Sequence, residues 1–267
     1  MKVAIYIKND TETHHNGKSK LIDALYRNGI EVVDRWNADI DIDMMISIGG
    51  DGTLLSAVHQ IGRLSIPVVG INFGHLGFLT TAGRDDIDKL ALCLKERRYT
   101  IEKRTMLEVT VENGGVQDNS TLFALNEVYL HRSDTSPLLH TQVQVDGDMV
   151  ATYAADGLIV ATPTGSTAYS LSCGGPILAP ESGCLVVTPI AAHTLTQRPV
   201  ILSDDVRLRL RDEDPAVRYT LGVDSFVSKV TGDSIIDIRK ADYQTQLVRI
   251  EHQNFFSAIR EKLMWGM

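Results

Sequence analysis

The spacing of hydrophobic and polar positions changes partway along the chain. Over roughly the first hundred residues, short apolar runs alternate with stretches whose apolar residues recur at helical spacing. The strand-like runs are 3–7, 30–34, 44–49 and 67–72, and the helical stretches are the one around Leu21, Ile22 and Leu25, 53–63 and 85–98. This alternation predicts an open α/β domain with a largely parallel sheet over residues 1–100.

After Arg98 the pattern alternates with a period of two, which predicts a β-rich domain over residues 101–250. The runs are 106–111, 121–132, 141–145, 148–153, 158–162, 206–211, 217–223 and 234–240. Asp146 and Gly147 separate two of them, a strong signal for a tight hairpin in which both residues take positive φ. Helical spacing returns over 254–266, and we expect the C-terminal segment 251–267 to pack back on the first domain.

Composition fits a folded chain of two domains. The 267 residues are 43% hydrophobic and 22% charged, with no long disordered tract. A formal net charge of -8 argues against nucleic acid as a partner, because neutralising phosphates requires a surplus of Lys and Arg. An acidic protein that binds anionic nucleotides must use backbone amides, helix N-termini and a metal ion.

The remaining sequence features exclude several classes. Three cysteines without a CxxC spacing indicate neither a disulfide framework nor a zinc site. Gly17-Lys18-Ser19 lacks the earlier glycine of a P-loop, since position 12 is Glu12, and no strand is followed by GxGxxG. The apolar run at the N-terminus is too short for a signal peptide, and no apolar stretch reaches 18 residues. We therefore expect a cytoplasmic protein with no membrane partner.

The first segment with candidate chemistry is Gly49-Gly50-Asp51-Gly52-Thr53, which lies between a predicted strand and a predicted helix. Glycine amides at such a junction can approach a phosphate closely. Asp51 would repel that phosphate, so its carboxylate is better explained as a base or a metal partner. The alternative is a tight turn in which Asp51 is only the helix N-cap.

A second segment runs from Asp156 to Pro176 and carries Thr162, Thr164, Gly165, Ser166, Thr167, Tyr169, Ser170 and Ser172. A buried strand leads into this run of hydroxyl and glycine residues, which offers many polar groups to a ligand. Asn126-Glu127 is a third candidate, because the pair interrupts a strand-like run. Neighbours on a strand face opposite ways, so both reach one ligand only where the strand ends or twists.

These segments closely resemble the NAD kinases. The resemblance extends from about residue 44 to the C-terminus and includes GGDGT, INFGHLGFL (71–79), LNE (125–127), the string from 156 to 178, TPIAAHTLTQRP (188–199) and FFSAIREKLMWG (255–266). TPTGSTAYSLS is highly specific, whereas 6-phosphofructokinases and diacylglycerol-type lipid kinases share GGDGT. The resemblance implies transfer of phosphate from ATP to the 2′-hydroxyl of the adenosine ribose of NAD, with a divalent metal, in practice Mg²⁺.

The resemblance also implies roles for individual residues. Asp51 is the catalytic carboxylate, and the expected phosphate contacts are Gly49, Gly50, Gly52, Thr53, Gly165 and Ser166. The expected NAD contacts are Gly52, Phe78, Asn126, Glu127, Asp156, Thr167, Ala168, Tyr169 and Ser172. Metal ligands are not specified. The family further suggests a homo-oligomer, a dimer or a tetramer made of dimers.

One departure concerns Asp224-Ser225-Phe226, where family members commonly carry glutamine at the third position, so any adenine contact of that glutamine is in doubt. Two rival functions stay open at this point. One is a lipid or sphingoid kinase of the same superfamily, which should lack the TPTGSTAYSLS run. The other is a catalytically silent NADP-sensing module, against which the intact Asp51 argues.

Overall fold

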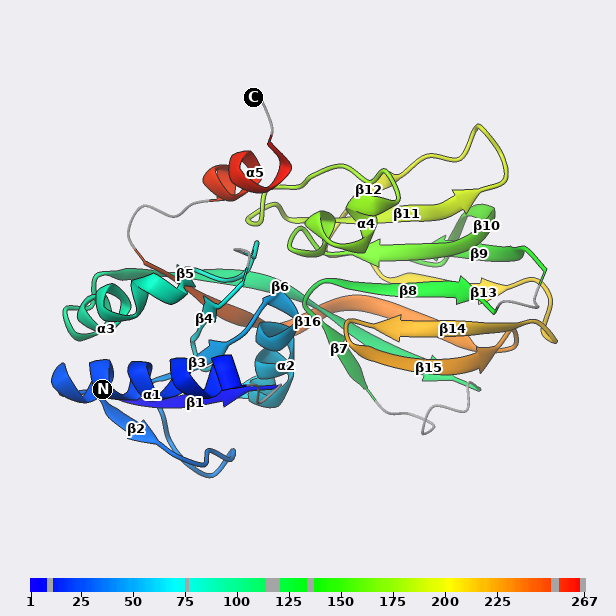
Figure 1. The fold of residues 1–267 in the computed structure, drawn as a ribbon. Helices are drawn as coiled ribbons and strands as arrows, with labels where there is room; N and C mark the ends of the chain where they lie inside the picture. Colours follow the sequence, from blue (N-terminus) through cyan, green and yellow to red (C-terminus); the bar gives the residue numbers. More distant parts are fainter. Residues whose placement is uncertain (9–11, 75–76, 114–120, 134–136, 251–254, 265–267) are drawn as a thin grey trace. The chain divides into compact units, whose positions relative to one another are not determined.

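The computed structural model describes residues 1–8, 12–74, 77–113, 121–133, 137–250 and 255–264 (Figure 1). The chain forms two compact units, and the first is built from both ends of the sequence. Met1–Arg104 and Gln244–Met267 form the first unit, and Thr105–Tyr243 forms the second. The predicted divisions were at residues 100 and 250. Both crossings between the units lie within long strands, β6 (Tyr99–Glu112) and β16 (Ile235–Ile250).

The first unit contains a parallel sheet, as the alternating pattern predicts. Its strands lie in the order β2 (Glu31–Val33), β1 (Lys2–Ile7), β3 (Met44–Ile48) and β4 (Val68–Asn72). The last part of β16 pairs in parallel with β4 through Leu247 and Val68, and β5 (Ala82–Gly83) pairs with the end of β4. Every residue of β3 and β4 is buried, as expected for central parallel strands.

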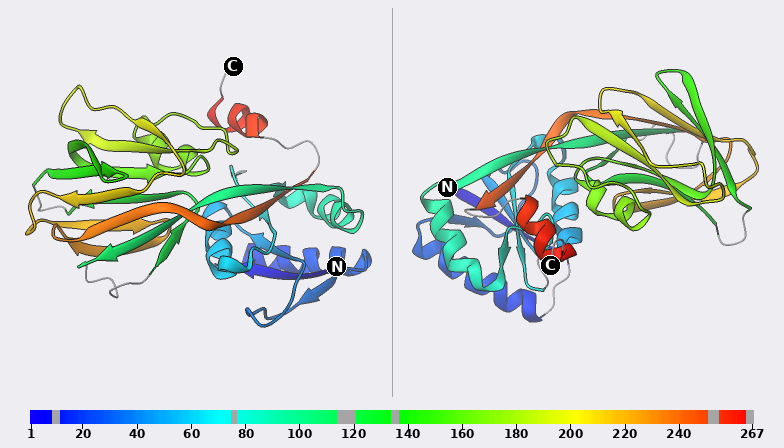
Figure 2. Two further views of the ribbon diagram at one scale, coloured as in Figure 1. Left: turned by 180° about the vertical axis from the view of Figure 1, so that it is seen from behind. Right: turned by 90° about the horizontal axis from the view of Figure 1, so that it is seen from above.

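Helices cover this sheet on both faces. Helix α1 (Glu12–Arg27) and helix α3 (Ile87–Lys95) lie side by side on one face, and α2 (Asp51–Ile61) lies on the other (Figure 2). A short 3₁₀ turn, η1 (Gly62–Leu64), directly follows α2, and a second one, η2 (Arg84–Asp86), directly precedes α3. Helix α5 (Phe255–Leu263) also belongs to the first unit, which confirms the expected return of the C-terminal helix.

The second unit is an antiparallel β structure, which confirms the predicted change of fold class. Its remaining strands are β7 (Leu122–Ala124), β8 (Glu127–Arg132), β9 (Leu139–Val145), β10 (Asp148–Ala161), β11 (Cys184–Ala192), β12 (Val200–Ser203), β13 (Leu208–Asp212), β14 (Arg218–Val223) and β15 (Phe226–Thr231). The main path of pairing is β15-β14-β8-β10-β9-β13-β16, and β11 joins β10 to β12. A single apolar core, which includes the fully buried Tyr219, underlies most of these strands.

Two local predictions have opposite outcomes. The hairpin at Asp146-Gly147 is confirmed, with φ of 52° and 93° at the two residues. The separate strands predicted at 148–153 and 158–162 are wrong, because β10 is continuous from Asp148 to Ala161. The intervening Ala154, Ala155, Asp156 and Gly157 resemble a turn in sequence, yet they continue the ladder that pairs β10 with β9, β8 and β11.

Within the described residues, no helix is both long enough and apolar enough to span a membrane.

Candidate active site

Asp51 lies at the junction between β3 and α2, where the glycine-rich segment was predicted to place it. It is the first residue of α2, and Gly50 occupies the N-cap position without a side-chain cap. The alternative that Asp51 is only a helix N-cap is therefore wrong. Its carboxylate instead accepts three backbone N–H groups, from Phe78 to Oδ2 at 2.8 Å, and from Leu79 and Thr80 to Oδ1 at 3.2 and 3.3 Å.

The loop that holds Asp51 requires a glycine at its start. A Cβ atom at Gly77 would lie 1.6 Å from Asp51 Oδ1, so no larger residue fits without moving the carboxylate. The amide of Gly77 donates to Thr80 Oγ1 at 2.8 Å, which closes the loop on itself. Residues 77–80, called the amide loop below, are therefore shaped around the Asp51 side chain.

The rest of the glycine-rich segment forms the entrance to α2. Gly49 is buried, Gly50 and Gly52 are exposed, and Thr53 is half-buried. The amides of a first helical turn have no acceptor within the helix, and the helix dipole adds a partial positive charge there. This end of α2 is consequently suited to an anion, and the Asp51 carboxylate is hydrogen-bonded to the amide loop.

Phe78 has an additional neighbour from the end of the chain. The ammonium group of Lys262, on α5, lies 4.7 Å from the centre of its ring. A cation at this distance is attracted by the electron-rich face of the ring. Helix α5 thus places a positive charge beside the loop that carries the Asp51 donors.

In the second unit, Asn126 and Glu127 lie at the break between β7 and β8. Their amides and that of Leu125 all donate to one carboxylate, Asp224, at 2.9, 3.1 and 2.7 Å respectively. Asn126 itself is half-buried. Asp224 holds the three consecutive amides and so fixes the backbone from which both candidate side chains project.

Glu127 is a buried carboxyl group in an acidic setting. Its side chain is 8% exposed, and Oε2 has no hydrogen-bond partner within the described structure. Burial, followed by the neighbouring charge of Asp224, raises the pKa of Glu127 to about 8, although the backbone amide of Tyr169 acts in the lowering direction. Glu127 therefore carries a proton at neutral pH in the free protein.

The hydroxyl-rich segment folds against the same break. Thr162 Oγ1 donates to the carbonyl of Leu125 at 2.5 Å, and the Thr162 amide donates to the carbonyl of Asn126 at 2.9 Å. Gly165 lies so close to Asn126 that a Cβ atom there would be 2.1 Å from the Asn126 carbonyl oxygen. Residues 125–127 and 162–165 are consequently packed tightly against each other.

Ser166 has a structural role. Its side chain is fully buried, and its hydroxyl donates to the carbonyl of Pro163 at 2.7 Å and accepts from the Leu178 amide at 2.9 Å. Gly165 is buried as well. In this conformation, neither residue presents a free group to a phosphate.

The other predicted contacts of this unit gather around Tyr169. Thr167 ends the 3₁₀ turn η3 (Gly165–Thr167), Ala168 follows, and Tyr169 and Ser172 bound helix α4 (Tyr169–Ser172). The rings of Tyr169 and Tyr129 meet edge to face, 5.5 Å between centres. Asp156 lies on β10 and accepts a hydrogen bond from Arg132 Nε at 2.6 Å, with about a third of each side chain exposed.

The predicted site residues thus form two groups, one in each unit. Asp51, its flanking glycines, Thr53 and Phe78 belong to the first, and the residues from Asn126 to Ser172 belong to the second. Two residues that contact these groups were absent from the predicted site, Asp224 and Arg132. In the sequence, Asp224 was noticed only as part of an altered family segment, and Arg132 carries no local signal.

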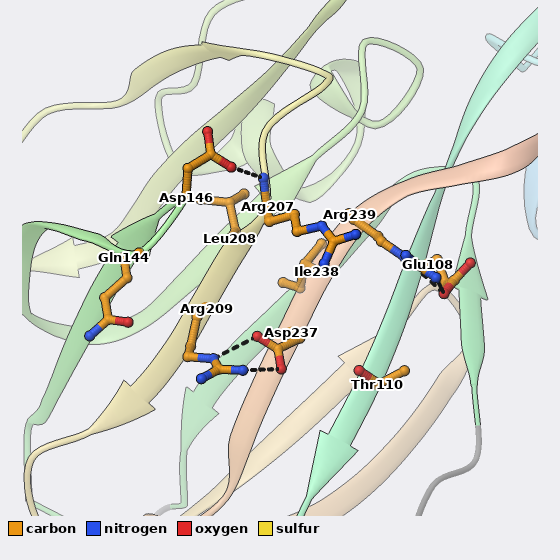
Figure 3. A pocket seen from close by; sticks show the side chains of 11 residues that line it. Glu108, Thr110, Gln144, Asp146, Arg207, Leu208, Arg209, Asp237, Ile238 and Arg239 are labelled. Carbon is orange, nitrogen blue, oxygen red and sulfur yellow. Dashed lines mark hydrogen bonds and ion pairs between the residues drawn. The ribbon is translucent and has the colours of Figure 1, made fainter.

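One cavity among the described residues lies elsewhere. It encloses about 470 Å³ on the second unit, and none of the predicted site residues lines it (Figure 3). Arg209 pairs with Asp237 through two bonds of 2.8 Å, and Arg239 pairs with Glu108. Both of these arginines are paired within the protein, and the cavity is separate from the site residues described above.

Comparison with known proteins agrees with this geometry. The ATP-NAD kinase N-terminal domain family matches residues 7–99, and the ATP-NAD kinase C-terminal domain family matches residues 125–250. The NAD kinase of Flavobacterium johnsoniae is 42% identical over 228 residues, which are 85% of this chain and 78% of that protein. The NAD kinase of Porphyromonas gingivalis is 41% identical over 84% of this chain and 77% of that protein. The chain belongs to the NAD kinase family.

Solved structures of the family share the fold. Yeast NADH kinase in complex with NADH superposes with a TM-score of 0.89 at 25% identity, covering 100% of this chain and 88% of that one. An NAD kinase from Archaeoglobus fulgidus in complex with ATP gives 0.79 at 26% identity, covering 99% of both chains. This chain is accordingly a kinase that forms NADP from NAD with ATP as phosphate donor.

Proposed function

We propose that Asp51 is the catalytic carboxylate of this NAD kinase and accepts the proton of the 2′-hydroxyl of the adenosine ribose as that oxygen attacks phosphorus. A ribose hydroxyl is a poor nucleophile at neutral pH, and a carboxylate within hydrogen-bond reach assists by taking its proton. The observation that carries the proposal is the fixed carboxylate, held by three consecutive amides beside a glycine-rich helix entrance. Phosphoryl transfer depends mainly on such positioning and on charge stabilisation.

The phosphate contacts in this proposal come from residues 49–53. The helix dipole favours an anion at the start of α2. Ser166 and Gly165, although the family resemblance implies phosphate contacts for them too, stabilise the fold around Asn126. We therefore assign the phosphates of the nucleotide to the first unit's glycine-rich segment.

The expected divalent ion, Mg²⁺, would bind in this arrangement together with the ATP phosphates. Among the described residues, no three His, Cys, Asp or Glu side chains gather closely enough to hold an ion by themselves. Mg²⁺ is commonly bound by one or two carboxylates together with substrate phosphates and water. Asp51 is the carboxylate of the glycine-rich segment that would hold it, and the ion would neutralise charge on the transferring phosphate.

The NAD contacts in the proposal are Gly52, Phe78, Asn126, Glu127, Asp156, Thr167, Ala168, Tyr169 and Ser172. Support comes from a polar group that the protein leaves unused: Glu127 Oε2 is buried and has no hydrogen-bond partner among the described residues. A buried polar group without a partner is costly, so a ligand that completes it gains affinity. Tyr169, in edge-to-face contact with Tyr129, adds a ring against which a flat group can pack.

We further expect a cytoplasmic enzyme that assembles as a homo-oligomer, a dimer or a tetramer made of dimers. The support for both is the family to which the chain belongs. Sedimentation velocity at micromolar concentration measures the assembly directly. A species that stays monomeric across the concentration range would contradict the expected oligomer and leave the activity unaffected.

A coupled assay tests the proposed function. Protein is incubated with NAD, ATP and Mg²⁺, and glucose 6-phosphate and its NADP-dependent dehydrogenase are then added, so that NADPH absorbance reports the NADP formed. The parent and Asp85→Asn, an exposed aspartate on η2, should give equal rates, and Asp51→Asn should give almost none. Phosphorylation of a sphingoid base in place of NAD would favour the lipid-kinase alternative.

A further inference from the structure

The amide loop, residues 77–80, is held from two sides. Its N–H groups at 78, 79 and 80 point to Asp51, and its carbonyl groups at 78 and 79 point to Arg249. Arg249 Nη2 donates to the Phe78 carbonyl at 3.1 Å, and Nη1 donates to the Leu79 carbonyl at 3.3 Å and to Thr81 Oγ1 at 3.4 Å. One guanidinium group therefore covers the face of the loop opposite the carboxylate.

The contacts of Arg249 and Asp51 meet in the same peptide groups. The Phe78 carbonyl and the Leu79 amide belong to one planar unit, and the Leu79 carbonyl and the Thr80 amide belong to the next. A cation that withdraws electron density from a carbonyl oxygen makes the N–H of that peptide a stronger donor. Both polarised amides donate to Asp51 Oδ1, whereas Oδ2 receives only the amide of Phe78.

Arg249 itself is fixed by a charged cluster at the start of β6. Its Nε donates to Glu102 Oε2 at 3.0 Å, and Arg104 pairs with the same carboxylate. Although burial raises it, Arg249 and Arg104 together hold the pKa of Glu102 below its ordinary value. Glu102 is thus shared by two arginines, and the other two nitrogens of the Arg249 guanidinium donate to the amide loop. Arg249 is 9% exposed, and water screens its charge poorly.

We propose that Arg249 is a positioning residue for catalysis, which acts through two peptide groups of the amide loop to fix Asp51 Oδ1 and leave Oδ2 as the oxygen that meets the ribose hydroxyl. The inference rests on the proposed role of Asp51. It assigns no contact between Arg249 and either substrate. Its effect should therefore fall on turnover and leave substrate binding nearly unchanged.

Steady-state kinetics of Arg249→Gln test this directly. Gln keeps one donor but loses the charge and the paired geometry, and we expect kcat to fall roughly tenfold or more while KM for NAD and for ATP stays within about threefold. Arg249→Lys, which keeps the charge, should recover part of the lost kcat. Arg239→Gln is the matched control, because it breaks an Arg–Glu pair of the second unit and should keep the parent kcat.

A double-mutant cycle separates positioning from a general structural effect. If Arg249 acts through Asp51, Arg249→Gln should change kcat by less than about twofold in the Asp51→Asn background. An equal loss in both backgrounds, or an unchanged kcat in the parent background, would overturn the inference. If Arg249→Gln fails to fold by circular dichroism, Glu102→Gln decides by the same criteria, with a smaller loss expected because Arg249 stays in place.

The outcomes also separate this inference from the proposed function. Parent turnover in Asp51→Asn would remove the proposed role of Asp51 and the inference with it. Lost turnover in Asp51→Asn together with parent turnover in Arg249→Gln would leave the role of Asp51 intact and overturn the inference alone.

Discussion

Two aspartates, one in each unit, are held by the same construction and serve different purposes. Asp51 accepts the amides of residues 78–80, and Asp224 accepts those of residues 125–127. In both cases a single carboxylate collects three consecutive N–H groups from a segment far away in sequence. Charge-assisted hydrogen bonds of this kind are stronger than neutral ones, so each aspartate fixes the local backbone.

The difference lies in what surrounds each carboxylate. Asp51 is the first residue of α2, and the loop that supplies its amide donors accepts hydrogen bonds from Arg249 through its carbonyl groups. Asp224 lies in the turn between β14 and β15 at φ 49°; burial raises the pKa of Glu127, and the charge of Asp224 raises it further. In the first unit, therefore, the amide loop holds the Asp51 carboxylate in place. In the second unit, the Asp224 carboxylate holds the backbone of residues 125–127 in place.

The largest expected effect belongs to Asp51→Asn. Asn keeps the size of the side chain but accepts no proton, and general-base assistance typically contributes about 10²- to 10⁴-fold in rate. We expect a folded variant that binds NAD within a few-fold of the parent by calorimetry and loses at least roughly 100-fold in turnover. Weakened binding with intact turnover would make Asp51 a binding residue, and full activity would remove it from the mechanism.

Glu127→Gln should alter how stability depends on pH. An unfolded Glu loses its proton near pH 4.5, whereas folded Glu127 keeps it to about pH 8. Between these values the unfolded state binds fewer protons, so the parent's free energy of unfolding falls as pH rises, by at most about 1.4 kcal/mol per pH unit.

Gln has no proton to lose, so between pH 5 and pH 8 the free energy of unfolding of this variant should rise relative to that of the parent by about 3 kcal/mol, most of the one-proton limit over that range. Urea denaturation at several pH values measures the gain. Parallel pH profiles for the two proteins would show that Glu127 is ionised throughout.

Gly77→Ala tests whether the amide loop is shaped around Asp51. The added Cβ would lie 1.6 Å from Oδ1, so the carboxylate must move. Small misplacements of a catalytic group lower the rate, so we expect kcat to fall about tenfold while the melting temperature changes little. Gly74→Ala is the control, since its nearest neighbour would be 3.6 Å away. Equal kcat in the two variants would contradict the proposed precision of the loop.

Asp224→Asn should have the smallest effect and the opposite signature. Asn tolerates the positive φ and still accepts hydrogen bonds, but it loses the charge, so we expect about 1 kcal/mol of lost stability. KM for NAD should rise a few-fold while kcat stays near the parent value, because residues 125–127 shift without any change at Asp51. A fall in kcat as large as that of Asp51→Asn would erase the distinction drawn between the two aspartates.

The fold class and many of the candidate site residues could be proposed from the sequence because they rest on local signals. Periodicity of apolar residues predicted the parallel sheet and the β-rich unit, and Asp146-Gly147 predicted its hairpin. The strand β10 was divided in two because Ala155, Asp156 and Gly157 imitate a turn, although Gly157 is needed for the close approach of the Leu130 carbonyl at 2.1 Å from its would-be Cβ.

Contacts between distant segments could not be predicted from local signals. Nothing near position 249 indicates that its guanidinium reaches carbonyl groups 170 residues earlier in the chain. The Asp224 carboxylate likewise accepts the amide of Leu125, 99 residues earlier in the chain. In the same way, Ser166 resembles a ligand residue in a hydroxyl-rich string, and only its burial shows that its hydroxyl is used within the protein.

The division of the first unit between both ends of the sequence constrains how the enzyme is made. A ribosome releases residues 1–104 early, but the strand segment that pairs beside β4, and Arg249 with it, emerges only after the entire second unit. Domains generally fold as units during synthesis, N-terminal ones first. Here the second unit can finish while the first still lacks one strand of its sheet, so the amide loop around Asp51 gains its Arg249 contacts only after residues 244–250 have been translated.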